Sequence, residues 1–589
     1  MRRASIFAII VAAFFTGQAQ GPRDISQNWE DVLHYIRIAR FDLAKAYGQL
    51  LVEGQVEPEI LYQLSAKSPQ DYQLLQRAST NAYDKELAQI AQKVLALIEQ
   101  GRQALRSDPK VIRQEIERLL GQSERGTAMA MQRLRDSGEY AVPFILQAMS
   151  DPSNRPYVDR LVQALAYVGG AAVRPLCAAI VASDAPIRAE VVRALGRIAS
   201  FEVLPYLKYV TETDRVDEIR AIAATGIMQV DPSVSANSAA SLFYRLATQY
   251  YQQRDPSQAA GFVNMWFWDP NTQGLVRRPV NGRYFNDLMA MSCCQWALKA
   301  DPGYSEAVGL WAAAFIRAQS YGIGLPGFLP HAQPGPMVFA TATGTRHLLQ
   351  ALARALNDGD KAVALGVLEA LAFTTGPRTA LNAVGQIQPL IEALRSDYMP
   401  VRTVAAIVIA SARLNEPFGA SGIVVEDLAS AIELGADPNA GSDPNIIGYA
   451  IRSLEAMLAI ASGPSGVYDL HPAQQGLMKA AQRGPAALRT PAYRVLAYIA
   501  TQQAQQTLAI QGLAADNDLD QRIVALESLG LSARLNGCLL DDGLLDRLLD
   551  LVRSDQADPE LRMAAAAALG CMDLPSARIR DLILGGSVD

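Results

Sequence analysis

One pattern recurs along the chain, and this recurrence constrains the fold more than any single residue does. A proline within an apolar stretch is followed by an aspartate and then by a run of small apolar residues. Copies of the pattern stand at Pro143, Pro175 and Pro205, with successive prolines 32 and 30 residues apart. A period of this length indicates a stacked array of short structural units, not one closed core.

Each part of the pattern has a physical role in a pair of helices. Proline is tolerated at a helix start, and alanine and glycine let neighbouring helices approach closely. Asp151, Asp184 and Asp214 fall in the turn between helices, where a carboxylate can accept hydrogen bonds from free amides. We expect Arg188 and Arg220, one turn inside the second helix, to pair with an aspartate of the adjacent repeat.

A second array follows in the C-terminal half. Pro389 leads to Asp397 and Arg402 in the same order, and later copies contain Arg522 and Arg562, which are 40 residues apart. Insertions of a few residues between helices account for the looser spacing. Alanine and leucine dominate the periodic segments, which favours helix throughout.

These positions closely resemble the HEAT repeat, including the variety named after phycobilisome lyases. Between the arrays, Ser241–Ala247 and Ala297–Ala307 are similar to parts of the tetratricopeptide repeat, or TPR. The resemblances imply an all-α fold: an α-solenoid of HEAT-like helix pairs with a TPR-like module that carries a small β-hairpin. The name of the HEAT variety also leaves open an enzyme or a chromophore-lyase-like factor.

The first residues have the three parts of a secretory signal peptide: a basic start, the apolar run Ala4–Phe15 and small residues up to Gly21. The apolar run is short for a bilayer span, although a retained anchor is the alternative. Removing residues 1–19 takes away two arginines, which leaves 51 basic and 59 acidic residues and a net charge of −8. This charge gives no electrostatic reason to bind nucleic acid or anionic membranes. We expect a periplasmic or extracellular protein.

The sequence therefore predicts six segments. We also expect one helix over Trp29–Leu51, in the second segment. The segments are a signal peptide at 1–20, an N-terminal helical cap region at 21–138, a HEAT-like array at 139–232, a TPR-like module at 236–330 with a β-hairpin at 262–280, a Gly/Pro linker at 331–345 and a second HEAT-like array at 346–585.

The hairpin segment contains the candidate partner-binding residues. Two β-prone runs flank a turn rich in Pro, Asn and Gly, which predicts a hairpin. In one interpretation its tryptophans fill a core, because large rings bury much area. In the other they form a recognition patch, because Trp and Arg are enriched at interface hot spots. The patch would comprise Trp266, Trp268, Arg277, Arg278 and Arg283.

Motifs for catalysis, cofactors and metals are incomplete. Gly322–Gly327 spells a dinucleotide fingerprint but lacks the strand before it and the helix after it. Acidic residues from Asp516 to Glu527 have the spacing of a calcium loop, yet Gln521 replaces the turn glycine. We therefore predict no catalytic, cofactor or metal site, and no cofactor. The predicted function is non-catalytic binding or scaffolding of protein partners, and the further alternative is a binder of envelope glycan or another polymer through exposed Trp266 and Trp268.

Overall fold

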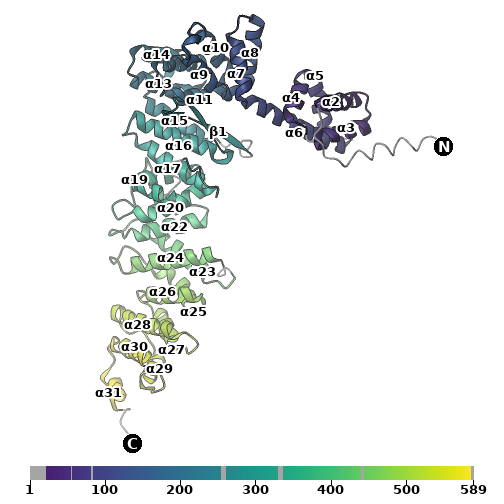
Figure 1. The fold of residues 1–589 in the computed structure, drawn as a ribbon. Coiled ribbons are helices and arrows are strands. Elements are labelled where there is room, and N and C mark those ends of the chain that lie inside the picture. Colours follow the sequence, from purple (N-terminus) through teal and green to yellow (C-terminus); the bar gives the residue numbers. More distant parts are fainter. Residues whose placement is uncertain are drawn as a thin grey trace, which may run out of the picture. The chain divides into compact units, whose positions relative to one another are not determined.

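The protein, described here by a computed structural model, consists almost entirely of helices (Figure 1). The structure describes residues 22–54, 56–80, 84–253, 261–328, 336–439 and 443–584, so the predicted signal peptide at 1–20 lies outside it. The chain divides into two compact units. The first comprises Met1–Ala239 and Asn264–Pro279, and the second comprises Ala240–Val263 and Val280–Asp589.

The first unit begins with a small bundle that has its own apolar core. Its helices are α2 (Pro22–Arg37), α3 (Phe41–Glu53), α4 (Pro58–Ala66), α5 (Pro69–Ser79) and α6 (Lys85–Ser107). Trp29, Leu51 and Leu61 are among its buried residues. The prediction of one helix over Trp29–Leu51 is wrong. The chain turns after α2, where Ala39 adopts a left-handed φ of 56°, which cannot continue a right-handed helix.

Helix pairs follow the bundle in the first unit, with short 3₁₀ helices labelled η. They are α7 (Pro109–Leu120), α8 (Glu124–Ser137), η2 (Gly138–Tyr140), α9 (Val142–Ser150), η3 (Pro152–Tyr157), α10 (Val158–Val168), α11 (Gly170–Ala179), α12 (Ala185–Arg197), η4 (Phe201–Val203), α13 (Leu204–Thr213), α14 (Asp217–Val230) and η5 (Pro232–Val234). Asp151 and Asp214 accept main-chain hydrogen bonds from the residue two positions on, as the turn prediction requires. Asp184 stands at the N-cap of α12 without such a bond.

The segment predicted to be TPR-like opens the second unit, except that Asn264–Pro279 of its hairpin belong to the first unit. It contains α15 (Ala239–Gln252), α16 (Gly282–Ala300), α17 (Ser305–Ser320) and α18 (Pro336–Ala342). The predicted hairpin forms as β1 (Phe262–Asp269) and β2 (Gly274–Asn281), the two strands of one small sheet. Of the predicted linker at 331–345, residues 331–335 lie outside the described residues. Helix α18 occupies much of the remainder, because its proline stands at the helix start, where no intrahelical amide bond is lost.

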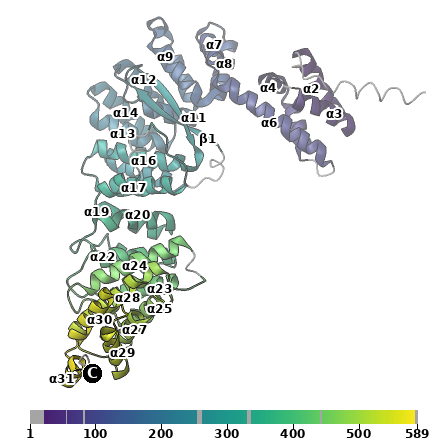
Figure 2. The ribbon, with the colours of Figure 1, turned by 60° about the horizontal axis from the view of Figure 1, so that its bottom comes forward.

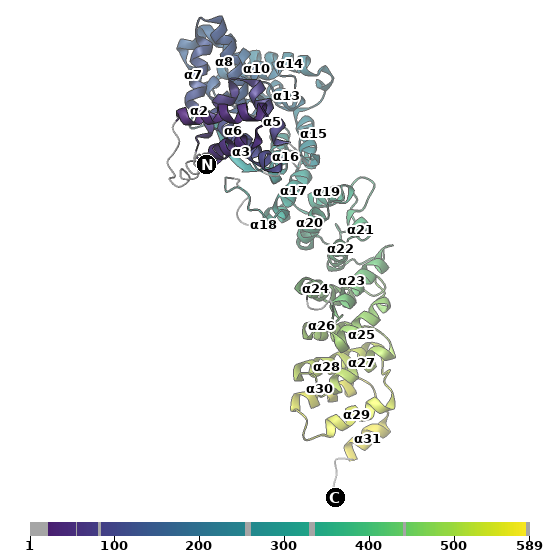
Figure 3. The same ribbon diagram turned by 90° about the vertical axis from the view of Figure 1, so that its right-hand side faces the viewer.

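The rest of the second unit is a stack of helix pairs. Its elements are α19 (Thr345–Asn357), α20 (Lys361–Thr374), α21 (Pro389–Ala393), α22 (Met399–Ser411), α23 (Ser421–Gly435), α24 (Pro444–Ala461), η7 (His471–Ala473), α25 (Gln474–Arg483), α26 (Ala486–Leu496), α27 (Gln502–Leu513), α28 (Leu519–Asn536), α29 (Asp542–Arg553), α30 (Pro559–Gly570) and α31 (Ser576–Leu584). Helices α24, α26, α28 and α30 form one column and α23, α25, α27 and α29 a second (Figure 2, Figure 3). This is an all-α solenoid.

An arginine recurs at one position of the second helix in many pairs. It is the fourth residue after the N-cap, and its guanidinium donates a hydrogen bond to a main-chain carbonyl at the end of the preceding helix or in the turn after it, with N···O distances from 2.7 to 3.2 Å. Carbonyls at a helix end lack intrahelical partners, so the arginine satisfies one of them. The residues are Arg188, Arg220, Arg402, Arg489, Arg522 and Arg562.

The same arginine can join adjacent pairs. Arg188 binds Asp214 of the next pair with two hydrogen bonds, Nε to Oδ2 at 2.6 Å and Nη2 to Oδ1 at 3.2 Å. Arg402 Nε lies 3.3 Å from Oδ1 of Asp427 in α23. The predicted pairing is therefore confirmed for Arg188. It is wrong for Arg220, which pairs with Asp217 of its own helix.

Glycine sets the distance between two helices of the first array. A Cβ on Gly196 of α12 would lie 2.8 Å from the Cα of Gly226 in α14, closer than real Cβ contacts allow. By contrast, a Cβ on Gly448 of α24 would meet no atom within 4 Å. Of these two positions, only Gly196 requires a glycine, because there two helix backbones approach closely.

Gly196→Ala should destabilise the first unit. Overpacking costs about 1–3 kcal/mol, and the better helix propensity of alanine offsets about 1 kcal/mol, so we expect a net loss near 1 kcal/mol. Gly448→Ala, the matched control, should raise stability by about 0.5–1 kcal/mol, since only propensity changes. Chemical denaturation of both variants checks the prediction. Equal effects of the two substitutions would contradict the close approach.

Candidate functional site

The structure brings together some of the predicted hairpin residues and separates others. Trp266 Nε1 donates a hydrogen bond to Oε2 of Glu139 at 2.9 Å, and the guanidinium of Arg277 lies over the ring of Tyr140, 4.9 Å from its centroid. Asn264 Nδ2 also donates to Glu139, at 2.7 Å to Oε1. The outer part of the hairpin thus packs on η2 within the first unit.

The other predicted residues have different surroundings. Trp268 is half-buried and Arg278 is exposed on β2. Arg283 belongs to α16 of the second unit, where its guanidinium lies 5.1 Å from the ring centroid of Tyr321. The recognition patch stays a prediction, with Trp266 and Trp268 only partly accessible. Sequence reasoning missed Glu139, because it stands 125 and 127 residues from the two side chains that bind it and belongs to no motif.

Glu139→Ala should loosen the hairpin, since it removes the acceptor of the half-buried Trp266 Nε1 and one of two acceptors of Asn264, whose amide keeps the hydroxyl of Tyr140. A buried donor left unsatisfied costs about 1–3 kcal/mol. Faster proteolytic cleavage at the turn between Asp269 and Gly274 would reveal the release. Glu139→Gln is the control, because it keeps one acceptor oxygen and should be cleaved at an intermediate rate. Unchanged cleavage in Glu139→Ala would show that these hydrogen bonds do not hold the hairpin.

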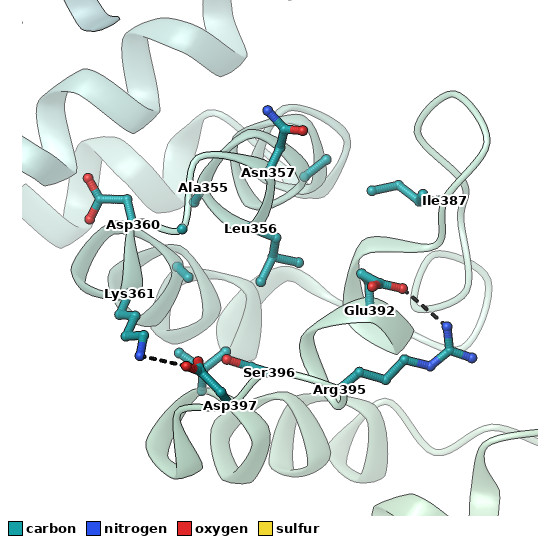
Figure 4. Close-up of a pocket in the computed structure, with 14 residues that line it drawn as sticks. Ala355, Leu356, Asn357, Asp360, Lys361, Ile387, Glu392, Arg395, Ser396 and Asp397 are labelled. Atoms are coloured by element: carbon teal, nitrogen blue, oxygen red, sulfur yellow. Dashed lines mark hydrogen bonds and ion pairs between the residues drawn. The ribbon is translucent and has the colours of Figure 1, made fainter.

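A pocket of about 410 Å³ lies between the pairs α19–α20 and α21–α22 of the second unit (Figure 4). Its position follows from local chain geometry. Helix α19 ends at Asn357, and Gly359 makes the tight turn into α20 with a φ of 64°, a conformation that favours glycine. The short helix α21 then ends before the polar residues Arg395–Asp397.

The lining combines an apolar wall with charged side chains. The apolar part includes Leu356, Ile387 and Val401. Lys361 Nζ donates to Asp397 Oδ2 at 3.1 Å, and Arg395 Nη1 donates to Glu392 Oε2 at 3.3 Å. These pairs face the pocket from both helix pairs (Figure 4).

The recurring arginine is absent from this pair of helices. Counted from the N-cap Asp360, the fourth residue of α20 is Ala364, which lines the pocket. Neither the main-chain carbonyl of Asp358 nor that of Gly359 accepts a hydrogen bond from a residue that the structure describes. The sequence carries the signal, an alanine where other pairs have arginine. It becomes visible only when the helix start is known, because this pair lacks the proline that marks the pairs at Pro143, Pro175, Pro205 and Pro389.

Asp360 connects the pocket to a buried ionic network. Its side chain accepts a hydrogen bond from the Val363 amide at 3.2 Å and lies 4.0 Å from Nη1 of Arg317. Arg317 donates to Oδ1 of Asp287 at 2.6 Å and to the carbonyl of Tyr251 at 2.6 Å. The network joins α15, α16, α17 and the start of α20, so it fixes the pocket's inner edge.

Burial raises the pKa of Asp287 to about 6, although Arg317 opposes the shift. An unfolded aspartate has a pKa of about 3.9, so the folded state holds the proton more tightly. The protonated Asp287 carboxyl therefore adds to the free energy of unfolding. This contribution is complete at pH values below the pKa of the unfolded state and is lost as the pH rises through about 6.

Lowering the pH from 7 to 5 should therefore raise the free energy of unfolding by about 1 kcal/mol through this carboxyl. Asp287→Asn should lack that increment, whatever its overall stability, because it removes the titrating group. Chemical denaturation at both pH values, compared between the two proteins, checks it. Identical pH dependence would show that Asp287 titrates normally.

The pocket offers binding groups and little for catalysis. Neither histidine nor cysteine lines it, and the hydroxyl of Ser396 accepts a hydrogen bond from the amide of Tyr398 at 3.2 Å. Across the described ranges, no group of three or more His, Cys, Asp and Glu side chains could hold a metal ion. No described helix has the length and apolar character needed to cross a membrane.

Comparison with known proteins identifies the repeats. Residues 142–228 match the HEAT repeat family, so the first array contains HEAT repeats. No curated protein matches the chain. The lyase variety and the TPR resemblance remain predictions.

Solved structures with some similarity include Kap95p, from a study of its binding to RanGDP, at 12% identity, covering 96% of this chain and 69% of that one with a TM-score of 0.29. Importin beta aligns at 14% identity, covering 87% and 73% with a TM-score of 0.27. Kap121p bound to Nup53p aligns at 13% identity, covering 96% and 55% with a TM-score of 0.30. At these TM-scores the likenesses carry no argument about function.

Proposed function

We propose that the protein is a non-catalytic solenoid that binds other proteins. The observation that carries this proposal is the pocket between α19–α20 and α21–α22, where exposed charged side chains and an apolar wall face solvent together. A mixed surface of this kind can hold the side chains of a polypeptide. Stacked repeats extend such a surface along one direction, which suits an extended partner.

The alternatives have less support. The lining of the pocket contains no side chain pair suited to nucleophilic catalysis, so no observation in it favours an enzyme or a chromophore-lyase-like factor. The glycan alternative requires accessible Trp266 and Trp268, and both are partly buried. We also propose export to the periplasm or cell exterior, and the support for it is the signal-peptide-like sequence of basic and apolar residues in Met1–Gly21.

A cross-linking pull-down from extracts of the source organism tests the function. The full chain serves as bait beside Ala353→Trp, which fills the pocket without changing its charge. We expect a recurrent protein partner that the variant captures several-fold less. A partner captured equally by both would keep the protein-binding function and remove the pocket from it. Failure of both baits to retain any protein would contradict the function.

A further inference from the structure

We propose that the pocket binds an arginine side chain of a partner polypeptide, which takes the place of the arginine that α20 lacks; this rests on the protein-binding function proposed above. In other pairs that arginine donates to a carbonyl at the end of the preceding helix. Here the corresponding position is Ala364, whose methyl group cannot donate a hydrogen bond. The exposed carbonyls of Asp358 and Gly359 accept no hydrogen bond from the described part of the chain, so a donor from another chain can reach them.

The hydrogen-bond acceptors at the pocket, a turn aspartate and main-chain carbonyls, are of the same kinds as those that the array's own arginines bind. Asp397 lies in the turn between α21 and α22, as Asp214 lies in the turn between α13 and α14, where it binds Arg188. The carbonyls of Asp358 and Gly359 end the α19 segment, as the carbonyl of Ala182 follows α11. A guanidinium has five donors in a planar fork, so one side chain can reach both a carboxylate and a carbonyl.

The bonds that Asp397 and Glu392 already make are weak competitors. Lys361 contributes one hydrogen bond to Asp397, and the two side chains are 48% and 80% exposed. Exposed ion pairs of this kind contribute about 0–1 kcal/mol. A bidentate guanidinium replaces such a bond at little cost, because the lysine ammonium regains water.

The charge and shape of the pocket favour an organic cation over an anion. Its lining holds three carboxylates, Asp360, Glu392 and Asp397, against Lys361 and Arg395, so one negative charge is in excess. The C-terminal turn of α19 adds partial negative charge, and the side chain of Asp360 already occupies the N-terminus of α20. The apolar wall suits the methylene stem of arginine.

Titration of the full chain with N-acetyl-arginine amide, followed by ligand-observed NMR, tests the pocket. N-acetyl-citrulline amide is the neutral isostere and should not bind, and N-acetyl-lysine amide should bind more weakly than arginine, since it lacks the fork. Asp397→Asn should weaken arginine binding by about 3-fold and Lys361→Gln should strengthen it by about 3-fold, the size of one exposed ion pair. Asp555→Asn, which removes a similar exposed carboxylate beside Arg562, should leave the affinity unchanged.

Ala364→Arg is the decisive variant, because it supplies the array's own arginine. It should abolish binding of N-acetyl-arginine amide and raise the thermal stability of the second unit. If it does not fold, the opposite effects of Asp397→Asn and Lys361→Gln still decide. Binding of citrulline as tightly as arginine, or weaker binding after Lys361→Gln, would overturn the proposal. Arginine binding without any protein partner in the pull-down would contradict only the protein-binding function. A captured partner with no arginine binding would contradict only the arginine site.

Discussion

The hydrogen bond from an arginine to the carbonyl at the end of the preceding helix is the interaction on which the array depends. Two antiparallel helices joined by a short turn leave carbonyls without partners at the end of the first helix. Arg188 and Arg402 bind a carbonyl in the turn just after that helix and also reach an acidic side chain of the next pair. One residue thus completes its own pair and fixes the next. Its repetition explains why irregular turn lengths are tolerated, since the arginine reaches carbonyls five to ten residues before it.

A local departure from this rule produces the pocket. Ala364 replaces the arginine, and its small side chain leaves space between the turns as well as unused acceptors. In α24 the corresponding residue is Ile447, which also cannot donate but is much bulkier. The structural cost is small, because in a solenoid each pair contacts only its neighbours and a missing hydrogen bond of about 1 kcal/mol stays local. Asp360 and the buried Arg317 network hold the edge of the pocket from the other side.

The sequence predicted the parts of the fold that depend on local signals. Proline at a helix start, aspartate in the turn and small residues on the second helix identify most of the pairs, and the Arg188–Asp214 bridge follows from their spacing. Pro175, expected at a helix start, instead lies inside α11. The turn at Ala39 escaped prediction because neither glycine nor proline marks it. The contact of Trp266 with Glu139 joins residues 127 positions apart, which no periodicity connects. The pocket escaped because its signal is an alanine among many alanines, informative only after the helix start is known.

A site made from a missing internal contact has a thermodynamic consequence. A ligand that supplies the contact stabilises the folded state by an amount that grows with its concentration relative to its dissociation constant. In an array of pairwise contacts that gain is concentrated in α19–α22, next to the network of Asp287 and Arg317. A partner's arginine would therefore stiffen the stack between the pairs α19–α20 and α21–α22. Occupancy of one pocket would then control how firmly these two neighbouring pairs of the second unit are joined.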